Sequence, residues 1–471
     1  MKSYKFLQQV FGRIRIIDNT LVTLSKSQLN VNDKVEQIDL MQDMKYEIIS
    51  HDLVKESLSD VLSKKENLND WQLKNIQLIN KIYEEINILP IDLVKALSKA
   101  RIEGKELWNL AYYDNNFKNL INPLSNVISL VREVASIKSK NFGYSMYDAV
   151  LEDYDSSIKE EDINDVCAIV GKFFHENNYL ITEKQNKSTD TKGIFHSINT
   201  ALNNTVLRRI KIKKTERVSD YHCFSSCSTQ FISNLNLSDL LYSSGSIIYK
   251  KGLQKKWINQ PIGDVSGYVM YETQGLLMEK IIGKSMEFCE YIQPIVFKHS
   301  DISVNDLYCE LNKINQSVLL KESDEFTSLA HIMIRYALEK EIIYNKLQVT
   351  DLRDAWMEGM KYYNISTKNI KDNEAYFQDH YWISGILGYF PLKLIAGIAA
   401  VQIFNFIKNN YSNAINNISK GNFDLLIKLL SENIYSHGAK YNSLELLKRM
   451  TNKENLDIEC YTNYLLQKYT Q

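Results

Sequence analysis

The chain has 471 residues, in which 56 lysines and arginines almost balance 57 aspartates and glutamates. The resulting formal net charge of −1 excludes a strongly basic nucleic-acid-binding protein. Hydrophobic residues make up 44% of the chain and charged residues 24%, a composition that excludes a disordered protein and supplies a large core. Only 17 glycines and 5 prolines are present, too few turn formers for many short strands, so a mostly helical fold is predicted.

The six cysteines do not form a disulfide framework, because only Cys223 and Cys227 are close in sequence. Reduced thiols in the cytoplasm are therefore expected. The N-terminal residues are mixed in character and show no export signal. The most apolar window, Trp382 to Ile407, is interrupted by Lys393 and Gln402. It is predicted to be a buried helix after a Gly-Tyr-Phe-Pro turn, and no membrane partner is expected.

In chain order, the first 180 or so residues are predicted to form successive amphipathic helices, since apolar residues recur at helical spacing, as in 70–87. Two later segments alternate with a period of two and are predicted strands, Val206 to Lys213 and Ser219 to Gln230. Helices return after them. We expect one body over 1–471, composed of an N-terminal helical part (1–180), a strand and loop insert (181–230) and a second helical part (231–471).

The helix predicted from Asp324 to Ile343 carries two stripes. Its apolar residues recur at spacings of three and four and predict a packed face. His331, Arg335 and Glu339 follow at i, i+4 and i+8 on another face, which places three polar groups in line. Two interpretations of that face stay open, a solvated Arg–Glu pair beside a satisfied histidine or a functional surface.

Three segments carry a stronger signal: Pro261 to Lys280, Glu325 to Glu339 and Gln378 to Gln402. In the same order, they resemble the stretches PLG…GIHESQSRLWEN, DEVTYNLHIxLRFELE and QDxHWSxGxFGYFPTY…AxQ of the carboxypeptidase Taq family of metallocarboxypeptidases. The resemblance implies an all-α, two-lobed metallopeptidase body with a deep groove, here with a small β insert, and it implies a homodimer. It also places Glu272 at the position of the third zinc ligand.

The zinc motif of that family is not preserved. A carboxypeptidase of this kind needs HExxH on a helix, because two histidines at i and i+4 face the metal while the glutamate takes a proton from the zinc-bound water. The family's HEAGHALYEQGL falls on Tyr242 to Leu253, where Tyr242 and Ser246 replace the histidines and Ser243 replaces the glutamate. None of the eight histidines forms an HxxxH pair, so a peptidase with unorthodox ligands would require a different register. We therefore expect no catalytic zinc and no other cofactor.

Polar groups that remain in the pocket are candidates for ligand binding. Arg335 offers a planar fork suited to a ligand carboxylate, and the alternative is an internal salt bridge to Glu339 or Glu272. If Glu272 is buried without a metal, it should pair with a cation or hold a proton.

Tyrosines complete the predicted binding set. Tyr242, Tyr271 and Tyr381 fall on histidine positions of the family pattern, and Tyr389 and His331 are expected beside them. Such a pocket would be phenolic and aromatic, which suits a ring or a hydrogen-bonding ligand.

Cys223 allows a different chemistry. On a strand, Cys223 and Cys227 would lie roughly 13 Å apart, too far to hold one ion. A nucleophilic Cys223 would need His331 as its base, because the adjacent His222 would point to the opposite face. Ordinary buried cysteines are the simpler interpretation.

Two functions follow from these observations. The first is a degenerate family member, not an active zinc carboxypeptidase, that binds a peptide C-terminus or a small carboxylate-bearing ligand in the old substrate groove, or binds another protein. The second is a repurposed enzyme that uses new acid–base or acyl-transfer chemistry, with turnover separating the two. Its candidate residues are Glu272, His331, Arg335, Tyr242 and Cys223.

Overall fold

The computed structural model describes residues 2–114, 117–180, 205–213, 235–296, 301–368 and 370–470. Within these ranges the regular secondary structure is helical, and no strand occurs. The four cysteines in the described ranges are free thiols. The all-α prediction is therefore confirmed.

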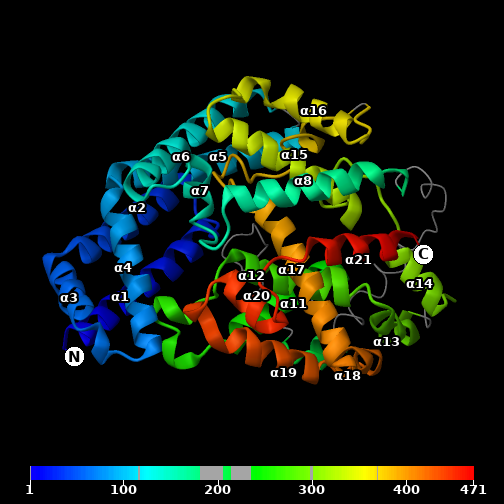
Figure 1. Cartoon of the computed structure of the whole chain (residues 1–471). Helices are drawn as coiled ribbons and strands as arrows, with labels where there is room; N and C mark the ends of the chain where they lie inside the picture. The colour runs from blue at the N-terminus through cyan, green and yellow to red at the C-terminus, as the bar shows by residue number, and fades with distance from the viewer. Residues whose placement is uncertain are drawn as a thin grey trace.

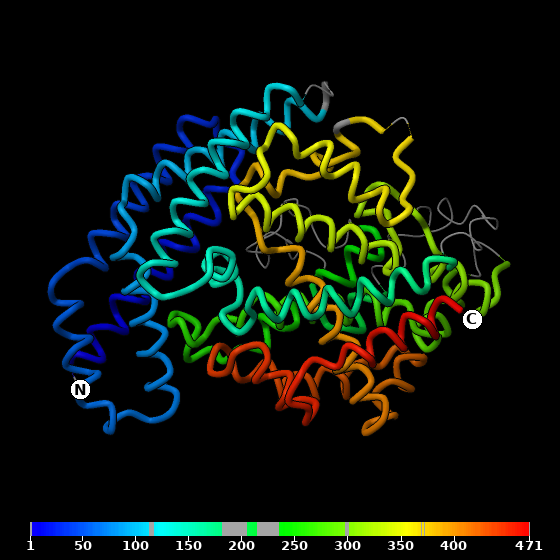
Figure 2. The backbone as a smooth tube through the Cα atoms, turned by 45° about the horizontal axis from the view of Figure 1, so that its top comes forward, coloured from blue at the N-terminus to red at the C-terminus, as the bar shows by residue number. Residues whose placement is uncertain are grey.

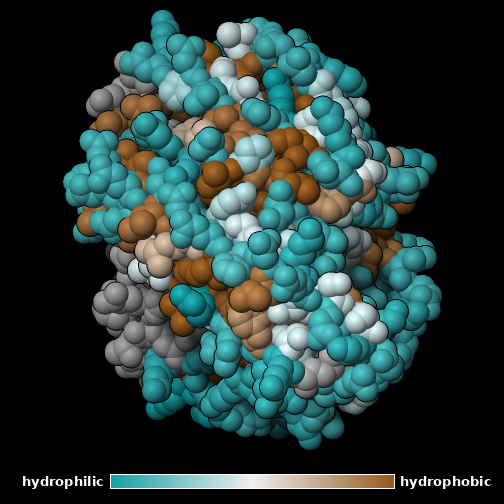
Figure 3. Space-filling model, turned by 90° about the vertical axis from the view of Figure 1, so that its left-hand side faces the viewer, coloured by the Kyte–Doolittle hydropathy of each residue, from teal (hydrophilic) through white to brown (hydrophobic). Residues whose placement is uncertain are grey.

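The N-terminal part builds the side of the molecule at the left of Figure 1 and part of its upper layer. Its helices are α1 (Lys2–Ser25), α2 (Val31–Ser50), α3 (Asp52–Ser63), α4 (Asp70–Ile88), α5 (Ile91–Asp114), α6 (Ile121–Phe142), α7 (Met146–Leu151) and α8 (Glu160–Glu176). A small separate core joins the first four helices, in which Leu7, Ile49, Val61 and Ile76 are fully buried. Figure 3 shows hydrophobic side chains interspersed with polar ones on the outer face of this side.

The second part carries the main helices of the body. They are α11 (Leu237–Gly252), α12 (Tyr268–Leu276), α13 (Met286–Val296), α14 (Val304–Leu311), α15 (Glu325–Ile343), α16 (Leu352–Tyr362), α17 (Tyr389–Asn410), α18 (Ser412–Asn416), α19 (Asp424–Asn433), α20 (Ser443–Thr451) and α21 (Ile458–Thr470). A π-helical segment, Leu277–Ile282, continues α12. One continuous core joins these helices to α6, α7 and α8, and α8 runs beside α21 (Figures 1 and 2).

The strand predicted at Val206 to Lys213 is wrong. Residues 205–209 are helical, and the backbone N–H of Ile210 donates to the carbonyl of Val206 at 3.0 Å. Val206, Leu207 and Ile210 are buried, a spacing of i, i+1 and i+4 that one face of a helix provides and one face of a strand does not. The strand predicted at Ser219 to Gln230 lies outside the described residues.

The long apolar window forms α17, which begins directly after Gly388 in a left-handed conformation with φ of 83°. In the described ranges, α17 is the helix whose length and composition would allow it to cross a membrane, and 83% of its most apolar window is buried inside the protein. It packs on α12, α15, α20 and α21. The prediction of a buried core helix is confirmed.

Candidate functional site

The site rests on a close crossing of α11 and α12. A Cβ atom added at Gly245 would overlap the carbonyl oxygen of Gln274, and one at Gly275 would lie 2.7 Å from the ring of Tyr242. Glycine is therefore required where the two backbones meet. The crossing sets Tyr242 of α11 beside Glu272 of α12, which are the two positions that the resemblance expects to converge.

Glu272 is fully buried, and three groups surround its carboxylate. Its Oε2 accepts hydrogen bonds from the hydroxyls of Tyr242 at 2.5 Å and Tyr268 at 3.0 Å. Its Oε1 lies 3.4 Å from Nζ of Lys393, which reaches over from α17. Glu272 thus pairs with a cation, which is one of the two arrangements expected for a buried carboxylate without a metal.

The electrostatics of this group are balanced. Burial raises the pKa of the Tyr242 and Tyr268 hydroxyls well above the ordinary value, and the charge of Glu272 adds to the rise, so both act as neutral donors. Burial alone would lower the pKa of Lys393, but the charges of Glu272 and Glu279 outweigh it and raise the pKa. The lysine therefore stays charged, and its ammonium also lies 5.7 Å from the ring centroid of Tyr242.

These groups do not suit a zinc ion. Zinc takes its protein donors from thiolates, imidazoles and carboxylates, whereas Glu272 faces two phenol hydroxyls and an ammonium group. That ammonium already supplies the positive charge that the carboxylate requires, and it would repel a divalent cation at the same oxygen. In the described ranges, no three His, Cys, Asp or Glu side chains are grouped to hold a metal.

The two serines of the altered motif lie inside α11. Ser243 and Ser246 are almost fully buried. The hydroxyl of Ser246 has no hydrogen-bond partner among the described residues.

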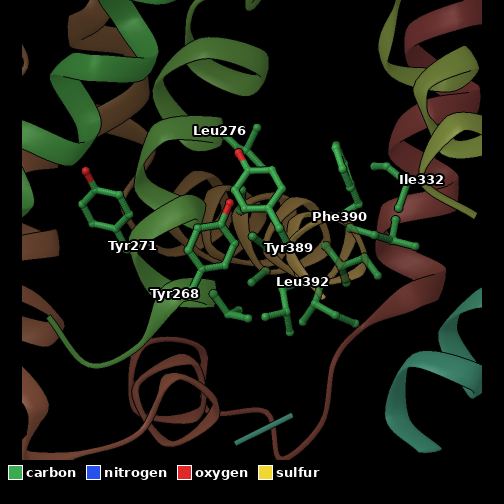
Figure 4. Close-up of a cluster of buried hydrophobic side chains, with 14 of the residues drawn as sticks. Tyr268, Tyr271, Leu276, Ile332, Tyr389, Phe390 and Leu392 are labelled. Atoms are coloured by element: carbon green, nitrogen blue, oxygen red, sulfur yellow. The ribbon is translucent and has the colours of Figure 1, made fainter. Parts of the chain in front are cut away.

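Aromatic rings continue the site from Tyr268. The ring centroid of Tyr389 lies 5.0 Å from that of Tyr268 and 4.8 Å from that of Tyr381. Figure 4 shows Tyr268 and Tyr389 side by side, with Tyr271 turned away on the other side of its helix. Tyr271 instead lies under the ammonium of Lys250, at 5.5 Å from its ring centroid. Tyr242 and Tyr389 therefore lie beside Tyr268, and Tyr381 stacks on Tyr389, whereas Tyr271 is turned toward Lys250.

Arg335 on α15 is fully buried and bound to a residue that sequence reasoning did not assign. Its Nη2 donates to Oδ2 of Asp379 at 2.7 Å, so Arg335 forms an internal salt bridge, the alternative to ligand binding, but with Asp379 and not with Glu339 or Glu272. The guanidinium carbon lies 4.3 Å from the ring centroid of Phe390. Its Nε and Nη1 have no hydrogen-bond partner within the described part of the chain.

The other two residues of this polar stripe, His331 and Glu339, are buried as well, so the solvated interpretation of this face is wrong. Glu339 accepts hydrogen bonds from Tyr147, Trp382 and the backbone N–H of Gly388, and burial raises its pKa to about 7. Nε2 of His331 lies 2.9 Å from a backbone carbonyl oxygen, and burial lowers its pKa to about 4. His331 is therefore neutral at pH 7.

Cys223, with His222 and Cys227, lies outside the described residues, so its distance from His331 is not defined. Two functional positions were missed by sequence reasoning, Lys393 and Tyr268. Lys393 did leave a signal, since it is a charged residue within the most apolar window of the chain. It falls on the last position of the FGYFPTY motif, where the family pattern has tyrosine.

Comparisons with known proteins agree with this architecture. The family model for carboxypeptidase Taq (M32) metallopeptidase matches residues 2–469. Thermostable carboxypeptidase 1 of Pyrococcus furiosus is 22% identical over 450 residues, which cover 90% of this chain and 89% of that protein. Metallocarboxypeptidase 1 of Trypanosoma cruzi superposes with a TM-score of 0.88 at 20% identity, over the full length of both chains. The M32 carboxypeptidase of Deinococcus radiodurans superposes with a TM-score of 0.85 at 20% identity, over 100% of this chain and 99% of that one. The chain belongs to the carboxypeptidase Taq (M32) metallopeptidase family.

Proposed function

We propose that this family member does not catalyse zinc-dependent peptide hydrolysis and instead binds a peptide C-terminus or another small carboxylate-bearing ligand at the family's substrate site. The observation that carries the proposal is the ion pair of Lys393 with Glu272 at 3.4 Å. In place of a metal, a fixed organic cation neutralises the carboxylate. A divalent ion would have to displace it and would still lack the two imidazole donors.

The groups that could meet a ligand are those that keep some exposure. Lys393, Tyr242 and Tyr381 are half-buried, and the side chain of Lys393 is 31% exposed. An ammonium between two phenol-bearing side chains suits a carboxylate that also carries an apolar or aromatic neighbour. Arg335 and His331 are fully buried, so their role in this proposal is to hold the wall of the site. In particular, Arg335 fixes Asp379.

Metal stoichiometry tests the first half of the proposal. The full chain, purified without chelator, is incubated with zinc, desalted and analysed by mass spectrometry for metal. We expect far less than one zinc ion per chain and no release of amino acids from peptides. One tightly held zinc per chain that is lost in the Glu272→Ala variant, together with peptide cleavage, would overturn the proposal.

Calorimetry with two forms of one short aromatic peptide tests the second half. The form with a free C-terminal carboxylate should bind at least about tenfold more tightly than the C-terminal amide. The amide loses the charged hydrogen bond to the ammonium of Lys393, which contributes about 1.4 kcal/mol or more to the binding free energy. Lys393→Met should abolish the difference, and Lys393→Arg, which keeps the charge, should retain it. Equal binding of both peptide forms to the unmodified protein would contradict the assignment.

A further inference from the structure

A second cavity lies away from the Glu272 site. It measures about 460 Å³, a size common for small-molecule sites, and is enclosed by the end of the π-helical segment, α13, α14, α17 and α21. Its polar lining includes three lysines and several amides, namely Lys284, Lys408, Lys468, Asn312, Asn463 and Gln467.

The positive charges of this cavity are only partly matched. Lys468 is buried and pairs with Glu325 at 2.8 Å, which leaves its charge neutralised. Lys284 is half-buried, and its ammonium forms no ion pair with a described carboxylate, nor does that of the exposed Lys408. The lining contains one acidic side chain, Glu287. Two unmatched lysines against one glutamate leave the cavity with an excess of positive charge.

Lys284 occupies a fixed position at the cavity wall. The side-chain amide of Asn312 donates to the carbonyl of Lys284 at 3.0 Å and to that of Tyr308 at 2.9 Å, which ties α14 to the turn before α13. The Oδ1 atom of Asn312 is buried and has no partner among the described residues. The backbone of the turn that carries Lys284 is therefore held against the end of α14.

The surroundings of Lys284 disfavour its charge. Burial, together with the nearby ammonium groups of Lys280 and Lys468, lowers its pKa to about 7. Glu325 and Glu279 oppose that shift. The other titratable or charged groups that line the cavity, on α13, α14, α17 and α21, are Glu287, Tyr308, Lys408, Cys460 and Tyr464. A bound anion would relieve the repulsion among the lysines and favour protonation of Lys284.

We propose that this cavity binds a small phosphate monoester, with its phosphate against Lys284 and its polar remainder against the amides of Asn463 and Gln467. The lining holds lysines and no arginine. Lysine binds phosphate as a point charge, and a phosphate group supplies about two negative charges for the two unmatched lysines, where a carboxylate supplies one. The amides offer both donors and acceptors for hydroxyl groups. The proposal does not depend on the ligand of the Glu272 site.

Calorimetry on the full chain with ribose 5-phosphate, inorganic phosphate, ribose and acetate tests the assignment. Ribose 5-phosphate should bind at least tenfold more tightly than ribose or acetate. If inorganic phosphate binds as tightly as the ester, the site binds the free anion, and the proposed contacts to the amides of Asn463 and Gln467 are wrong.

Lys284→Met should weaken the binding of ribose 5-phosphate at least tenfold. The matched control Lys428→Met removes an exposed lysine of α19 that pairs with Glu432, and it should leave binding unchanged.

The pH dependence gives a second measurement. Because Lys284 must be protonated to hold the phosphate, the affinity of the unmodified protein should fall as the pH rises from 7 to 8. Lys284→Arg should keep the affinity and lose this dependence, since arginine stays charged throughout that range. Equal effects of Lys284→Met and Lys428→Met, or acetate binding as tightly as ribose 5-phosphate, would overturn the proposal. Either result would leave the Lys393 experiments unaffected.

Discussion

Two lysines show how differently the same side chain is placed in this molecule. Lys393 approaches a buried carboxylate whose remaining contacts are two phenol hydroxyls, and the group is electrically balanced. Lys284 borders an open cavity of about 460 Å³ and has two other lysines nearby. The first arrangement is balanced, because the protein itself supplies the cation opposite Glu272. The second leaves a site open, because a charge lacks its partner.

The difference also distinguishes a lysine that stabilises the folded state from a lysine that is available to bind a ligand. Around Glu272, removing any partner leaves a charge buried in a low-dielectric interior. Around Lys284, removing the lysine relieves its repulsion with Lys280 and Lys468. The predictions below test these opposite expectations.

The largest effect is expected where the backbones of the balanced site meet. Gly245→Ala would push a methyl group into the carbonyl of Gln274 and force α11 away from α12. We expect a loss of about 4 kcal/mol in the free energy of unfolding, measured by urea denaturation. Gly171→Ala is the matched control in α8, where the added methyl would lie 3.6 Å from Sδ of Met333. It should be neutral or stabilising by up to about 1 kcal/mol, and equal losses in both variants would contradict the account.

Lys393→Met breaks the charge balance directly. It leaves Glu272 buried with only neutral partners, and we expect a loss of about 3 kcal/mol, near the lower end for buried pairs because Lys393 is partly exposed. The measurement is urea denaturation at pH 7. The double variant with Glu272→Gln should recover most of the loss, because both charges are then absent. A double variant as unstable as the single one would show that Lys393 acts through packing and not through its charge.

His331 shows a third way in which this protein accommodates a buried titratable group, because its imidazole remains neutral. Its pKa is lowered to about 4 in the folded protein from 6.5, so between these values the folded state binds fewer protons than the unfolded state. Its contribution to stability is therefore complete above pH 6.5 and is lost as the pH falls toward 4. Between pH 7 and pH 5 we expect the titration of His331 to lower the free energy of unfolding by about 2 kcal/mol.

His331→Gln, which can still donate to the carbonyl of Ser317, should reduce this part of the pH dependence. Unfolding free energies at pH 7, 6 and 5 provide the comparison. The same slope in the variant and in the unmodified protein would contradict the prediction.

The smallest effect has the opposite sign. Lys284→Met should stabilise the protein by about 1 kcal/mol at pH 7, because it removes an unmatched, partly buried charge. Since the pKa of Lys284 is lowered to about 7, the folded state binds fewer protons than the unfolded state from there up to 10.5, and the unmodified protein gains stability over that range. The advantage of the variant should therefore shrink as the pH rises above 7. A loss of stability in both Lys284→Met and Lys393→Met would remove the distinction between the two sites.

Much of this architecture follows from the sequence. The helix predicted from Asp324 to Ile343 is observed as Glu325–Ile343, and the carboxylate of Asp324 caps it by accepting from the backbone N–H groups of Phe326 and Thr327. Local periodicity and capping are enough for such an element. The register from the family motif also placed Tyr242 and Glu272 in one site, and the two residues, on α11 and α12, are hydrogen-bonded to each other.

Other features are set by contacts between distant segments and were missed for that reason. The partner of Arg335 is Asp379, 44 residues away, and no local pattern distinguishes it from the glutamates nearer in sequence. Lys393 lies 121 residues beyond the carboxylate that it neutralises. The helix at 205–209 was mistaken for a strand because a short apolar run fits both periods and its burial is decided by the surrounding helices.

The crossing at Gly245 has a consequence for how this site can change over evolutionary time. The approach of the α11 backbone to α12 depends on the missing side chain at Gly245, whereas Gly275 makes room for the side chain of residue 242; the side chains of residues 242, 243 and 246 are not the atoms that a Cβ at Gly245 would meet. Mutations at those three positions can therefore exchange one chemistry for another while the backbone stays where it was. A protein that keeps the two glycines can therefore lose a function at this site and still fold. Substitutions at positions 242, 243 and 246 can then give the site a different chemistry.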